Sequence, residues 1–313
     1  MARANHSYGI DIGGTKIELV ACDDSLKVVH RKRVDTPTKD FDAFVEAIVA
    51  LVADADLLLN GQSPVGLGVP GIIDARTGRH LSSNVPALND RVLLGVLEER
   101  LKRKVVLGND CQCFALSEAQ GGSAADHPSM FGAILGTGVG GGYCVNGKLL
   151  RGFNGLAGEW GHCAAPASLL RRYQLPVVKC SCGLTGCLER YISGKGLGFL
   201  YQHHAGIQLA SEISASTIAS RLVEGDPMAK LVFDIHLDLL AKGLADLVLT
   251  IDPHVIVLGG GLSKLSHLYT DLPKAVATHL FDGVRVPPIL PPTFGDAGGA
   301  RGAALLARQQ GSY

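Results

Sequence analysis

The sequence predicts an α/β protein made of two similar halves, and two observations indicate this fold class. Short apolar segments typical of strands alternate with longer segments of helical periodicity. In addition, a strand, a glycine turn and a second strand occur twice, at 8–22 and again at 131–145. A chain of 313 residues is long enough for two domains. We expect a smaller domain of residues 1–114 plus about 298–313, and a larger domain of about 115–297.

The first half is expected to begin as an antiparallel meander, because Gly13-Gly14 and the polar residues 23–25 separate three strand-like runs. Apolar residues then recur at helical spacing between Phe41 and Leu59. The expected elements are strands at 8–12, Lys16–Cys22 and 27–34, a helix at 41–59, a strand at Val65–Val69, a helix near 91–101, a strand at 104–107 and a helix from about Cys111.

The second half repeats the opening of the first, with a glycine turn between two strands. The expected elements are strands at 131–135, Val139–Val145 and 148–151, helical segments that include 228–251, a strand at 254–258 with a further helix, a strand at 285–290 and an alanine-rich helix after Gly298. The repeat suggests a duplicated α/β unit with a cleft between the halves.

The composition favours an enzyme that acts on small molecules. Hydrophobic residues make up 47% of the chain and charged residues 19%, and 29 Lys+Arg balance 29 Asp+Glu. A chain with this balance has no excess positive charge for a polyanion, so nucleic acid is not an expected partner.

Neither a signal peptide nor a membrane span is expected. Residues 1–7 are polar, and the apolar stretch at 244–251 is interrupted by Asp246 and too short to cross a bilayer. We therefore expect a cytoplasmic protein without a membrane partner. In that compartment the eight cysteines are expected to be thiols or metal ligands.

A first phosphate loop is predicted at the turn Asp11-Ile12-Gly13-Gly14-Thr15-Lys16. Backbone N–H groups at Gly13 and Gly14 can hold phosphate oxygens, and the Thr15 hydroxyl can add a bond. Asp11 can orient Mg²⁺ through water. A tight hairpin turn without a ligand would have a similar sequence, so this alternative stays open.

A second glycine-rich loop lies at 135–142. Its candidate nucleotide-binding residues are Gly136, Thr137, Gly138, Gly140, Gly141 and Gly142. The loop matches G-x-G-x-x-G, but that dinucleotide fingerprint must open a helix. Residues 143–147 are typical of a strand and a turn, so we reject a Rossmann site. The chain also lacks the G-x-x-x-x-G-K-[ST] of P-loop enzymes.

A third glycine turn, Gly259-Gly260-Gly261, follows an apolar strand. Such a turn could let a base and ribose lie against the backbone, although a plain strand-to-helix turn is nearly as common. Three such turns at corresponding places in two halves favour a phosphate-rich ligand.

The segment at 180–187 predicts a zinc site. Cys180, Cys182 and Cys187 lie within eight residues, and the glycines between them permit tight turns. Zinc needs a fourth ligand, which His162 can supply, and a closed Cys₃His set would be structural. The alternatives are three reduced cysteines in a loop, or Cys163 as the fourth ligand.

Asn109 and Asp110 follow a strand, at the position where ligands collect in open α/β sheets. Asp110 could accept the proton of a substrate hydroxyl, as the base of a kinase does, and Asn109 suits a sugar hydroxyl. Equally, Asp110 could be the N-cap of the helix that follows.

Other polar residues could line the same ligand. Glu159 and Glu189 are close in sequence to the expected zinc ligands, where a rigid backbone could hold carboxylates against sugar hydroxyls. Gly71 and Asn84 belong to the loop that follows the strand at Val65–Val69. Solvated surface carboxylates and ordinary turn chemistry are the alternatives.

Taken together, these motifs resemble the ROK family (repressors, open reading frames and sugar kinases), and the resemblance runs from Asp11 to the final helix. The matching motifs are 11–16, Asn109-Asp110, 136–141, Gly158-Glu159-Trp160-Gly161-His162 and the cysteine segment with Glu189. The resemblance implies a duplicated actin-like ATPase (ribonuclease H-like) fold, with two domains flanking a cleft for ATP and sugar.

The resemblance also implies roles for individual residues. Asp110 matches the general base that activates the sugar 6-hydroxyl, and the Gly13 and Gly136 loops match the two phosphate-binding turns. The matching sugar contacts are Asn109, Glu159, His162 and Glu189, and the matching zinc ligands are His162, Cys180, Cys182 and Cys187. ATP with Mg²⁺, a structural Zn²⁺ and a homodimer are implied in the same way.

Within the family the chain is similar to the bacterial N-acetyl-D-glucosamine kinases, which implies transfer of phosphate to the 6-hydroxyl of that sugar. One departure is Cys111-Gln112-Cys113 after Asp110, where Ala-Asn is more usual. A kinase for glucose, fructose or N-acetylmannosamine is an alternative, because one or two side chains can decide acceptance of an acetamido group.

A member of a different class, a sugar-responsive repressor or a catalytically weak sugar sensor, is the other alternative. Repressors of this family carry a helix-turn-helix domain, and here only seven residues precede the first strand. The balanced charge also argues against DNA binding.

Overall fold

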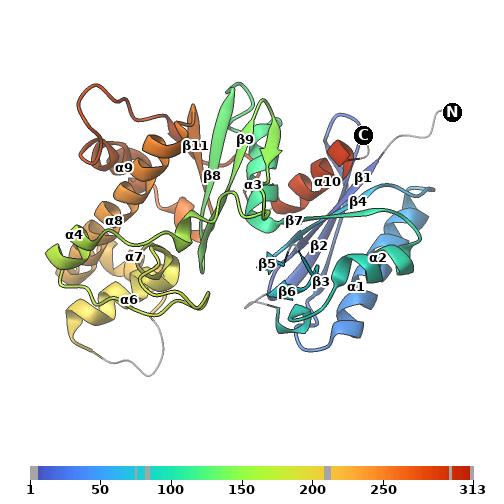
Figure 1. Cartoon of the computed structure of the whole chain (residues 1–313), viewed down its shortest axis with the longest axis horizontal. Coiled ribbons are helices and arrows are strands. Elements are labelled where there is room, and N and C mark those ends of the chain that lie inside the picture. Colours follow the sequence, from blue (N-terminus) through green and yellow to red (C-terminus); the bar gives the residue numbers. More distant parts are fainter. Residues whose placement is uncertain (1–5, 75, 82–84, 208–212, 296–297, 311–313) are drawn as a thin grey trace. The chain divides into compact units, whose positions relative to one another are not determined.

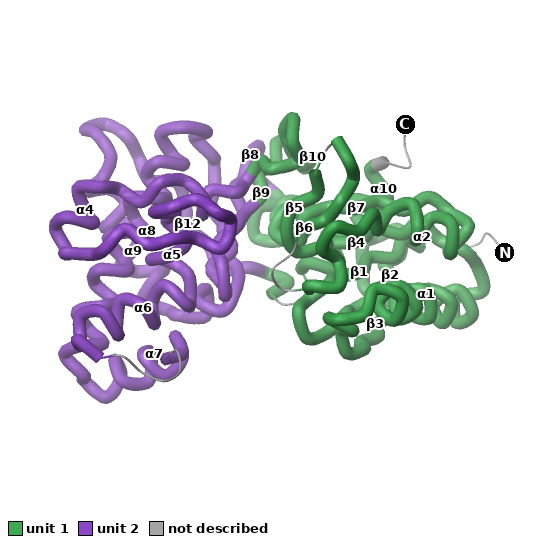
Figure 2. The backbone as a smooth tube through the Cα atoms, turned by 60° about the horizontal axis from the view of Figure 1, so that its bottom comes forward, with its two compact units in different colours: residues 1–125, 142–157, 293–313 green, residues 126–141, 158–292 purple. Residues whose placement is uncertain are grey.

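The computed structural model describes residues 6–74, 76–81, 85–207, 213–295 and 298–310. The chain divides into two compact units, coloured separately in Figure 2. Unit 1 consists of residues 1–125, 142–157 and 293–313, and unit 2 of residues 126–141 and 158–292. The boundaries expected near 114 and 298 stay a prediction, because packing units and the domains that move in catalysis need not coincide.

The elements of the first 125 residues follow the expected order. They are β1 (Ser7–Ile12), β2 (Lys16–Cys22), β3 (Val28–Asp35), α1 (Phe41–Leu58), β4 (Val65–Val69), β5 (Ile72–Ile73), β6 (His80–Leu81), α2 (Leu93–Leu101), β7 (Val105–Asn109) and α3 (Asp110–Ala119). The short pair β5–β6 lies in a segment expected to be a loop.

The remaining described elements include six α-helices between residues 160 and 280. They are β8 (Ser129–Leu135), β9 (Val139–Val145), β10 (Lys148–Leu150), α4 (Ala167–Arg172), α5 (Glu189–Ile192), α6 (Gly194–Ala205), α7 (Ala215–Val223), α8 (Pro227–Ile251), β11 (Val255–Gly259), α9 (His267–Ala277), β12 (Ile289–Leu290) and α10 (Gly298–Gln310). Short 3-10 turns lie at Pro86–Leu88, Trp160–His162 and Gly261–Lys264.

The first sheet has the order β3-β2-β1-β4-β7. Its meander β1–β2–β3 is antiparallel, whereas β1, β4 and β7 run parallel. Because parallel strands end at the same edge, the ends of β1, β4 and β7 bring Ile12, Val69 and Asn109 to one side of the sheet. This edge carries the acidic residues described below.

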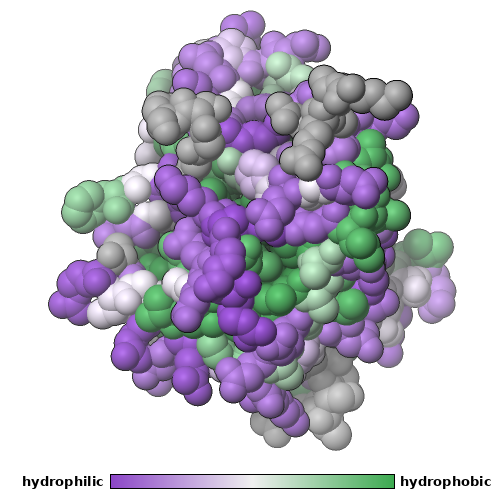
Figure 3. Space-filling view, turned by 90° about the vertical axis from the view of Figure 1, so that its right-hand side faces the viewer, coloured by the Kyte–Doolittle hydropathy of each residue, from purple (hydrophilic) through white to green (hydrophobic). Residues whose placement is uncertain are grey.

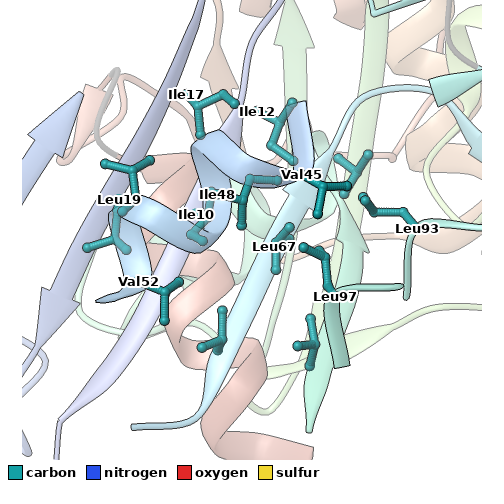
Figure 4. Close-up of a cluster of buried hydrophobic side chains, with 14 of the residues drawn as sticks. Ile10, Ile12, Ile17, Leu19, Val45, Ile48, Val52, Leu67, Leu93 and Leu97 are labelled. Atoms are coloured by element: carbon teal, nitrogen blue, oxygen red, sulfur yellow. The ribbon is translucent and has the colours of Figure 1, made fainter. Parts of the chain in front are cut away.

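The two faces of this sheet are covered by different helices (Figure 1). On one face, alternate apolar residues of the strands pack against α1 and α2, with the side chains shown in Figure 4 almost fully buried. The labelled members are Ile10, Ile12, Ile17, Leu19, Val45, Ile48, Val52, Leu67, Leu93 and Leu97. The spacing of Val45, Ile48 and Val52 is that of one helix face, which confirms the predicted amphipathic helix.

On the other face, α10 lies unusually close to the strands. A Cβ atom added to Gly9 in β1 would lie 1.8 Å from the carbonyl oxygen of Ala300, and one added to Gly66 in β4 would lie 2.0 Å from that of Ala303. Gly302 makes the corresponding approach to α3, where a Cβ would lie 1.7 Å from the Cys113 carbonyl oxygen. The alanine and glycine content of the last helix is therefore required by its packing.

The substitution Gly302→Ala is expected to lower the melting temperature of the protein strongly. Its methyl group would overlap backbone atoms, which cannot move aside as a side chain can, so we expect a cost of about 3 kcal/mol or more. Gly95→Ala is the matched control, because Gly95 also lies in a helix but has nothing within 4 Å of an added Cβ. That change should stabilise by about 0.5–1 kcal/mol. Calorimetry that gave equal melting temperatures for the two variants would contradict the packing described here.

The second sheet has the order β10-β9-β8-β11-β12, the same pattern as the first sheet. The pairs β8–β11 and β11–β12 are parallel, and β9–β10 is antiparallel. The boundary between the units falls inside β9, after Gly141. The repeated strand order confirms the predicted duplication.

In unit 2 the longest helix is α8, whose ends follow ordinary capping chemistry. The Asp226 carboxylate accepts hydrogen bonds from the N–H groups of Met228 (2.7 Å) and Ala229 (3.3 Å), and Pro227 occupies the first helical position. The helix ends at Asp252, which has a φ of 42°. Its buried side includes His236.

The strand expected at 285–290 was wrong in length, because only Ile289–Leu290 pairs with β11. Pro287 and Pro288 precede it and have no N–H to donate to a ladder. The Pro288 carbonyl still accepts a hydrogen bond from Ile256 N–H at 2.9 Å.

No helix among the described residues is both long and apolar enough to cross a membrane. Polar side chains cover most of the face shown in Figure 3, with smaller apolar areas among them.

Candidate active site and metal centre

In unit 1, Asp11 and Asp110 meet at the edge of the first sheet. Asp11 is near the end of β1 and Asp110 begins α3 directly after β7. Gly68 of β4 lies between them, since a Cβ added to it would be 3.5 Å from Asp11 Oδ1 and 3.5 Å from Asp110 Cα. Two acidic residues predicted for different roles are therefore neighbours.

The environment of this pair disfavours two negative charges. Burial, and next the charge of Asp110, raises the pKa of Asp11 to about 7. Burial also raises the pKa of Asp110 above its ordinary value. The carboxylate of Asp11 lies against Gly299 at the start of α10, where a Cβ would be 2.7 Å from Asp11 Cγ. Such a pair can bind a divalent cation, and one of its carboxylates can accept a proton. Carboxylates with shifted pKa values are common at functional sites.

The helix cap at α3 is Asn109, not Asp110. Asn109 Oδ1 accepts hydrogen bonds from the N–H groups of Cys111 (2.9 Å) and Gln112 (3.3 Å), and its Nδ2 donates to the Gly71 carbonyl at 3.4 Å. Asp110 is the first helical residue, and its Oδ1 accepts from Cys111 N–H at 2.9 Å. Because Asn109 caps the helix, the alternative in which Asp110 is the N-cap is weakened. Asn84 lies outside the described residues.

The first glycine turn links β1 and β2 as predicted. Gly13 N–H donates to the Lys16 carbonyl at 2.9 Å, and the Thr36 hydroxyl donates to the Gly13 carbonyl at 2.8 Å. These two bonds fix the backbone of the turn, and Gly14, Thr15 and Lys16 are exposed. The turn therefore presents its outer backbone and side chains to solvent.

The second glycine loop, in unit 2, is a tight turn between β8 and β9. Gly136 N–H donates to the Gly138 carbonyl at 2.9 Å, and Thr137 at the tip is exposed. Gly140, Gly141 and Gly142 lie within β9. The prediction that a strand follows this loop is confirmed, which excludes the Rossmann geometry.

Two of the last three glycines, Gly141 and Gly142, are needed for packing. A Cβ on Gly141 would lie 2.6 Å from the Gly132 carbonyl oxygen, and one on Gly142 would lie 2.7 Å from Ala115 Cβ. The Gly140 carbonyl accepts a hydrogen bond from the indole of Trp160 at 2.8 Å. The ligand contacts predicted for the six residues of this loop stay a prediction.

The third glycine turn lies next to the second one. Gly260, with a φ of 77°, follows β11, and a Cβ there would lie 2.6 Å from the Leu135 carbonyl oxygen and 2.9 Å from Gly136 N. The two turns meet because β8 and β11 are parallel neighbours. Gly259 is the last residue of β11, one residue beyond the expected end of that strand.

Four predicted zinc ligands of unit 2 converge. Ligand atoms of His162, Cys180, Cys182 and Cys187 all lie within 4.8 Å of one another. Cys182 Sγ is 3.6 Å from Cys187 Sγ, and Cys180 Sγ is 3.8 Å from His162 Nδ1. A tetrahedral Zn²⁺ with Zn–S bonds of about 2.3 Å needs sulfurs about 3.8 Å apart, so the residues fit this ion.

The electrostatics of the cluster also fit a bound cation. Burial, followed by the hydrogen bonds with Cys182 and Cys180, raises the pKa of Cys187 to about 12. Thiolates at this spacing would repel one another unless a cation lay among them. Cys163, the alternative ligand, is exposed and outside the cluster.

Glu159 and Glu189 flank the cluster. Glu159 Oε2 is 3.9 Å from His162 Nε2, so that this ring nitrogen points to a carboxylate while Nδ1 points to the sulfurs. Glu189 begins α5 two residues after Cys187, and its Oε2 accepts a 2.8 Å hydrogen bond from Val139 N–H. Its contact with the second glycine loop was not foreseen from the sequence.

No role was predicted from the sequence for two further buried residues, Gln112 and Trp160. Gln112 is buried in α3, and its amide donates to the carbonyls of Gly155 (2.9 Å) and Ala157 (3.1 Å). The unusual Cys-Gln-Cys sequence was the available signal. Trp160 is buried beside Phe131 with ring centroids 6.3 Å apart.

Comparison with known proteins identifies relatives over almost the whole chain. The ROK family matches residues 7–310. The N-acetylgalactosamine kinase AgaK of Shewanella sp. (strain ANA-3) is 46% identical over 301 residues, which cover 96% of each protein. The N-acetyl-D-glucosamine kinase of Aliivibrio salmonicida (strain LFI1238) is 42% identical, covering 96% of this chain and 98% of the relative.

Solved structures give the same picture. A ROK family glucokinase from Streptomyces griseus, in complex with glucose and AMPPNP, superposes with a TM-score of 0.77 at 28% identity. The alignment covers 97% of this chain and all of that one.

Proposed function

This chain belongs to the ROK family, and from that premise we propose that it transfers the γ-phosphoryl group of ATP to the 6-hydroxyl of N-acetyl-D-glucosamine, releasing ADP. Its fold is the duplicated actin-like ATPase fold of the ROK sugar kinases. The observation that carries the proposal is the half-buried pair Asp11 and Asp110 at the edge of the first sheet, in a chain whose relatives are named hexosamine kinases.

We assign the general base to Asp110. Its Oδ1 is held by Cys111 N–H, which orients the carboxylate, and the other oxygen takes the proton of the sugar hydroxyl. The raised pKa makes Asp110 a stronger base than an exposed aspartate, so proton transfer is easier at the moment of attack.

The glycine turns are the proposed phosphate sites. In the turns Gly13–Thr15 and Gly136–Gly138, the N–H groups of Gly13 and Gly136 close the turns. The N–H groups of the residues that follow them are the proposed donors to phosphate, on backbone that does not need to reorganise, which is the way phosphoryl transfer is stabilised. The turn at Gly259 and Gly260 is the proposed contact for the nucleoside. Mg²⁺ bound with ATP would neutralise phosphate charge, and Asp11 is the carboxylate that would hold it through water.

The proposed sugar contacts are Gly71, Asn84, Asn109, Glu159, His162 and Glu189. Carboxylate oxygens at Glu159 and Glu189 suit sugar hydroxyls, and His162 presents Nε2 beside Glu159. A structural Zn²⁺ on the four-residue cluster would fix the backbone that carries them. A homodimer and a cytoplasmic location belong to the same proposal.

N-acetyl-D-galactosamine is a second candidate substrate, because the relative at 46% identity is named for it. The two sugars differ only in the configuration at C4, so one hydrogen bond to that hydroxyl can decide between them.

The test is ADP release with Mg-ATP and five sugars, namely N-acetylglucosamine, N-acetylgalactosamine, N-acetylmannosamine, glucose and fructose. We expect kcat/KM for N-acetylglucosamine to exceed that for glucose by about tenfold or more, since loss of the acetamido group leaves polar partners unpaired. A preference for N-acetylgalactosamine would keep the kinase and change the sugar. Binding of sugar without turnover would favour a sensor.

A further inference from the structure

The segment from Cys187 to Gly194 connects the metal cluster of unit 2 to the second glycine loop. At one end, Cys187 is part of the cluster. Two residues later, Glu189 Oε2 accepts the N–H of Val139, the first residue after the loop, at 2.8 Å. At the other end, Gly194 N–H donates to the carbonyl of Gly136, the first residue of the loop, at 2.8 Å. Both ends of the loop are thus bound by one short stretch of chain.

Glu189 fits tightly between the cluster and the loop. A Cβ on Gly138 would lie 2.6 Å from Glu189 Oε2, so the carboxylate occupies the space beside this glycine. Its other oxygen, Oε1, lies 3.7 Å from Cys180 Sγ. One carboxylate therefore contacts a predicted metal ligand and the phosphate loop at the same time.

The connecting segment is itself held firmly at positions away from the cluster and the loop. His236, which is fully buried in α8, lies with Nε2 2.9 Å from the Ile192 carbonyl oxygen. The fully buried Tyr191 donates from its hydroxyl to the Pro176 carbonyl at 2.8 Å. Glu189 therefore lies between Cys187 of the cluster and the anchored residues Tyr191 and Ile192.

We propose that Glu189 is the positioning residue through which the metal cluster holds the turn Gly136–Gly138 of the second glycine loop in its nucleotide-binding form. The proposal rests on the function given above, in which this loop binds ATP phosphates. Metal at the four ligands fixes Cys180 and Cys187, these fix Glu189, and its carboxylate fixes Val139 N–H. Bound metal and bound nucleotide should then strengthen each other, although none of the four metal ligands is a proposed nucleotide contact.

The experiment measures binding of AMP-PNP with Mg²⁺, without sugar, by titration calorimetry. Zinc-loaded protein is compared with protein stripped by a chelator that takes zinc and leaves Mg²⁺. We expect stripping to weaken AMP-PNP binding by about fivefold or more, the usual lower range for coupled sites. The reciprocal measurement is the affinity for zinc, which AMP-PNP should raise by the same factor.

Substitutions at Glu189 test whether this residue carries the coupling between metal and nucleotide. The Glu189→Ala protein should retain zinc but bind AMP-PNP weakly, with loaded and stripped forms alike. Glu189→Gln keeps an oxygen that can accept the Val139 N–H bond, so the coupling should be largely restored. Glu224→Ala, at an exposed glutamate in the same unit, is the control and should couple as the wild type does.

Three results would overturn part or all of the proposal. Equal AMP-PNP affinity of loaded and stripped wild type would overturn the coupling while leaving the kinase function in place. Unchanged coupling in Glu189→Ala would overturn the role of this residue. Failure of loaded wild type to bind AMP-PNP at all would overturn the proposed function and the inference together. If the stripped protein unfolds, the loaded Glu189→Ala and Glu189→Gln proteins still give the comparison.

Discussion

Replacing Asp110 by asparagine is expected to lower kcat by about two orders of magnitude or more, because the amide cannot accept the proton of the sugar hydroxyl. The fold should persist, since Asn109 supplies the helix cap and the amide oxygen of an asparagine can still accept the Cys111 N–H. Steady-state ADP release measures the effect. Asp23→Asn is the matched control, because Asp23 is a partly exposed aspartate that likewise accepts hydrogen bonds from backbone N–H groups in unit 1. A kcat close to that of the wild type would remove Asp110 from the mechanism.

The same variant should gain stability at neutral and higher pH. Burial raises the pKa of Asp110 in the folded protein, so between its ordinary value and the raised one the folded state binds more protons than the unfolded state. The stability from this group is therefore lost as pH rises through the raised pKa, and the neutral amide avoids that loss. Asp11, with a pKa of about 7, adds to the trend. Lost activity with an unchanged or raised melting temperature at pH 8 would be the signature of a functional carboxylate.

Cys182→Ser is expected to remove the metal and the affinity for sugar together. The serine hydroxyl is a poor zinc ligand, and a three-ligand site cannot be closed. The backbone that carries Glu159, His162 and Glu189 would then lose its fixed anchor. Metal analysis should fall from about one zinc per chain to near zero, and calorimetry should show weaker binding of N-acetylglucosamine.

Cys163→Ser is the control for this prediction, because Cys163 is exposed and outside the cluster. It should keep both zinc and sugar affinity. Unchanged zinc content in Cys182→Ser would refute the metal site, and loss of zinc with normal sugar affinity would confine its role to local stability.

Sequence reasoning was most successful where a single short segment carries the information. The three cysteines that converge with His162 lie within eight residues, and their spacing was enough to predict that they lie together. The first glycine turn lies between two alternating strands, so its place in a hairpin followed directly. The fold class followed from the same strand–turn–strand pattern seen twice.

Contacts between distant segments could not be predicted in this way. Glu118 in α3 is fully buried and accepts hydrogen bonds from the N–H groups of Ser123, Thr293 and Phe294, which lie 5 to 176 residues away. In sequence it is an ordinary helical glutamate. Glu189 is a similar case, because its bond to Val139 depends on how α5 packs beside β9.

The cap of α3 shows a finer limit. Asn109 and Asp110 are both good capping residues, and the choice between them depends on where the strand β7 ends. Pairing of β7 with β4 continues to Asn109. The cap is therefore Asn109, one residue before Asp110, and Asp110 is the first helical residue. That single residue leaves the Asp110 carboxylate available for chemistry.

The most direct test of the account is the position and selectivity of phosphoryl transfer by the purified chain. ADP release should be fastest per unit concentration with N-acetylglucosamine, and NMR of the product should place the phosphorus on O6. An N-acetylgalactosamine preference would change only the substrate assignment. A product phosphorylated at another oxygen, or ADP release that is independent of added sugar, would contradict the assignment of Asp110 as base for the 6-hydroxyl.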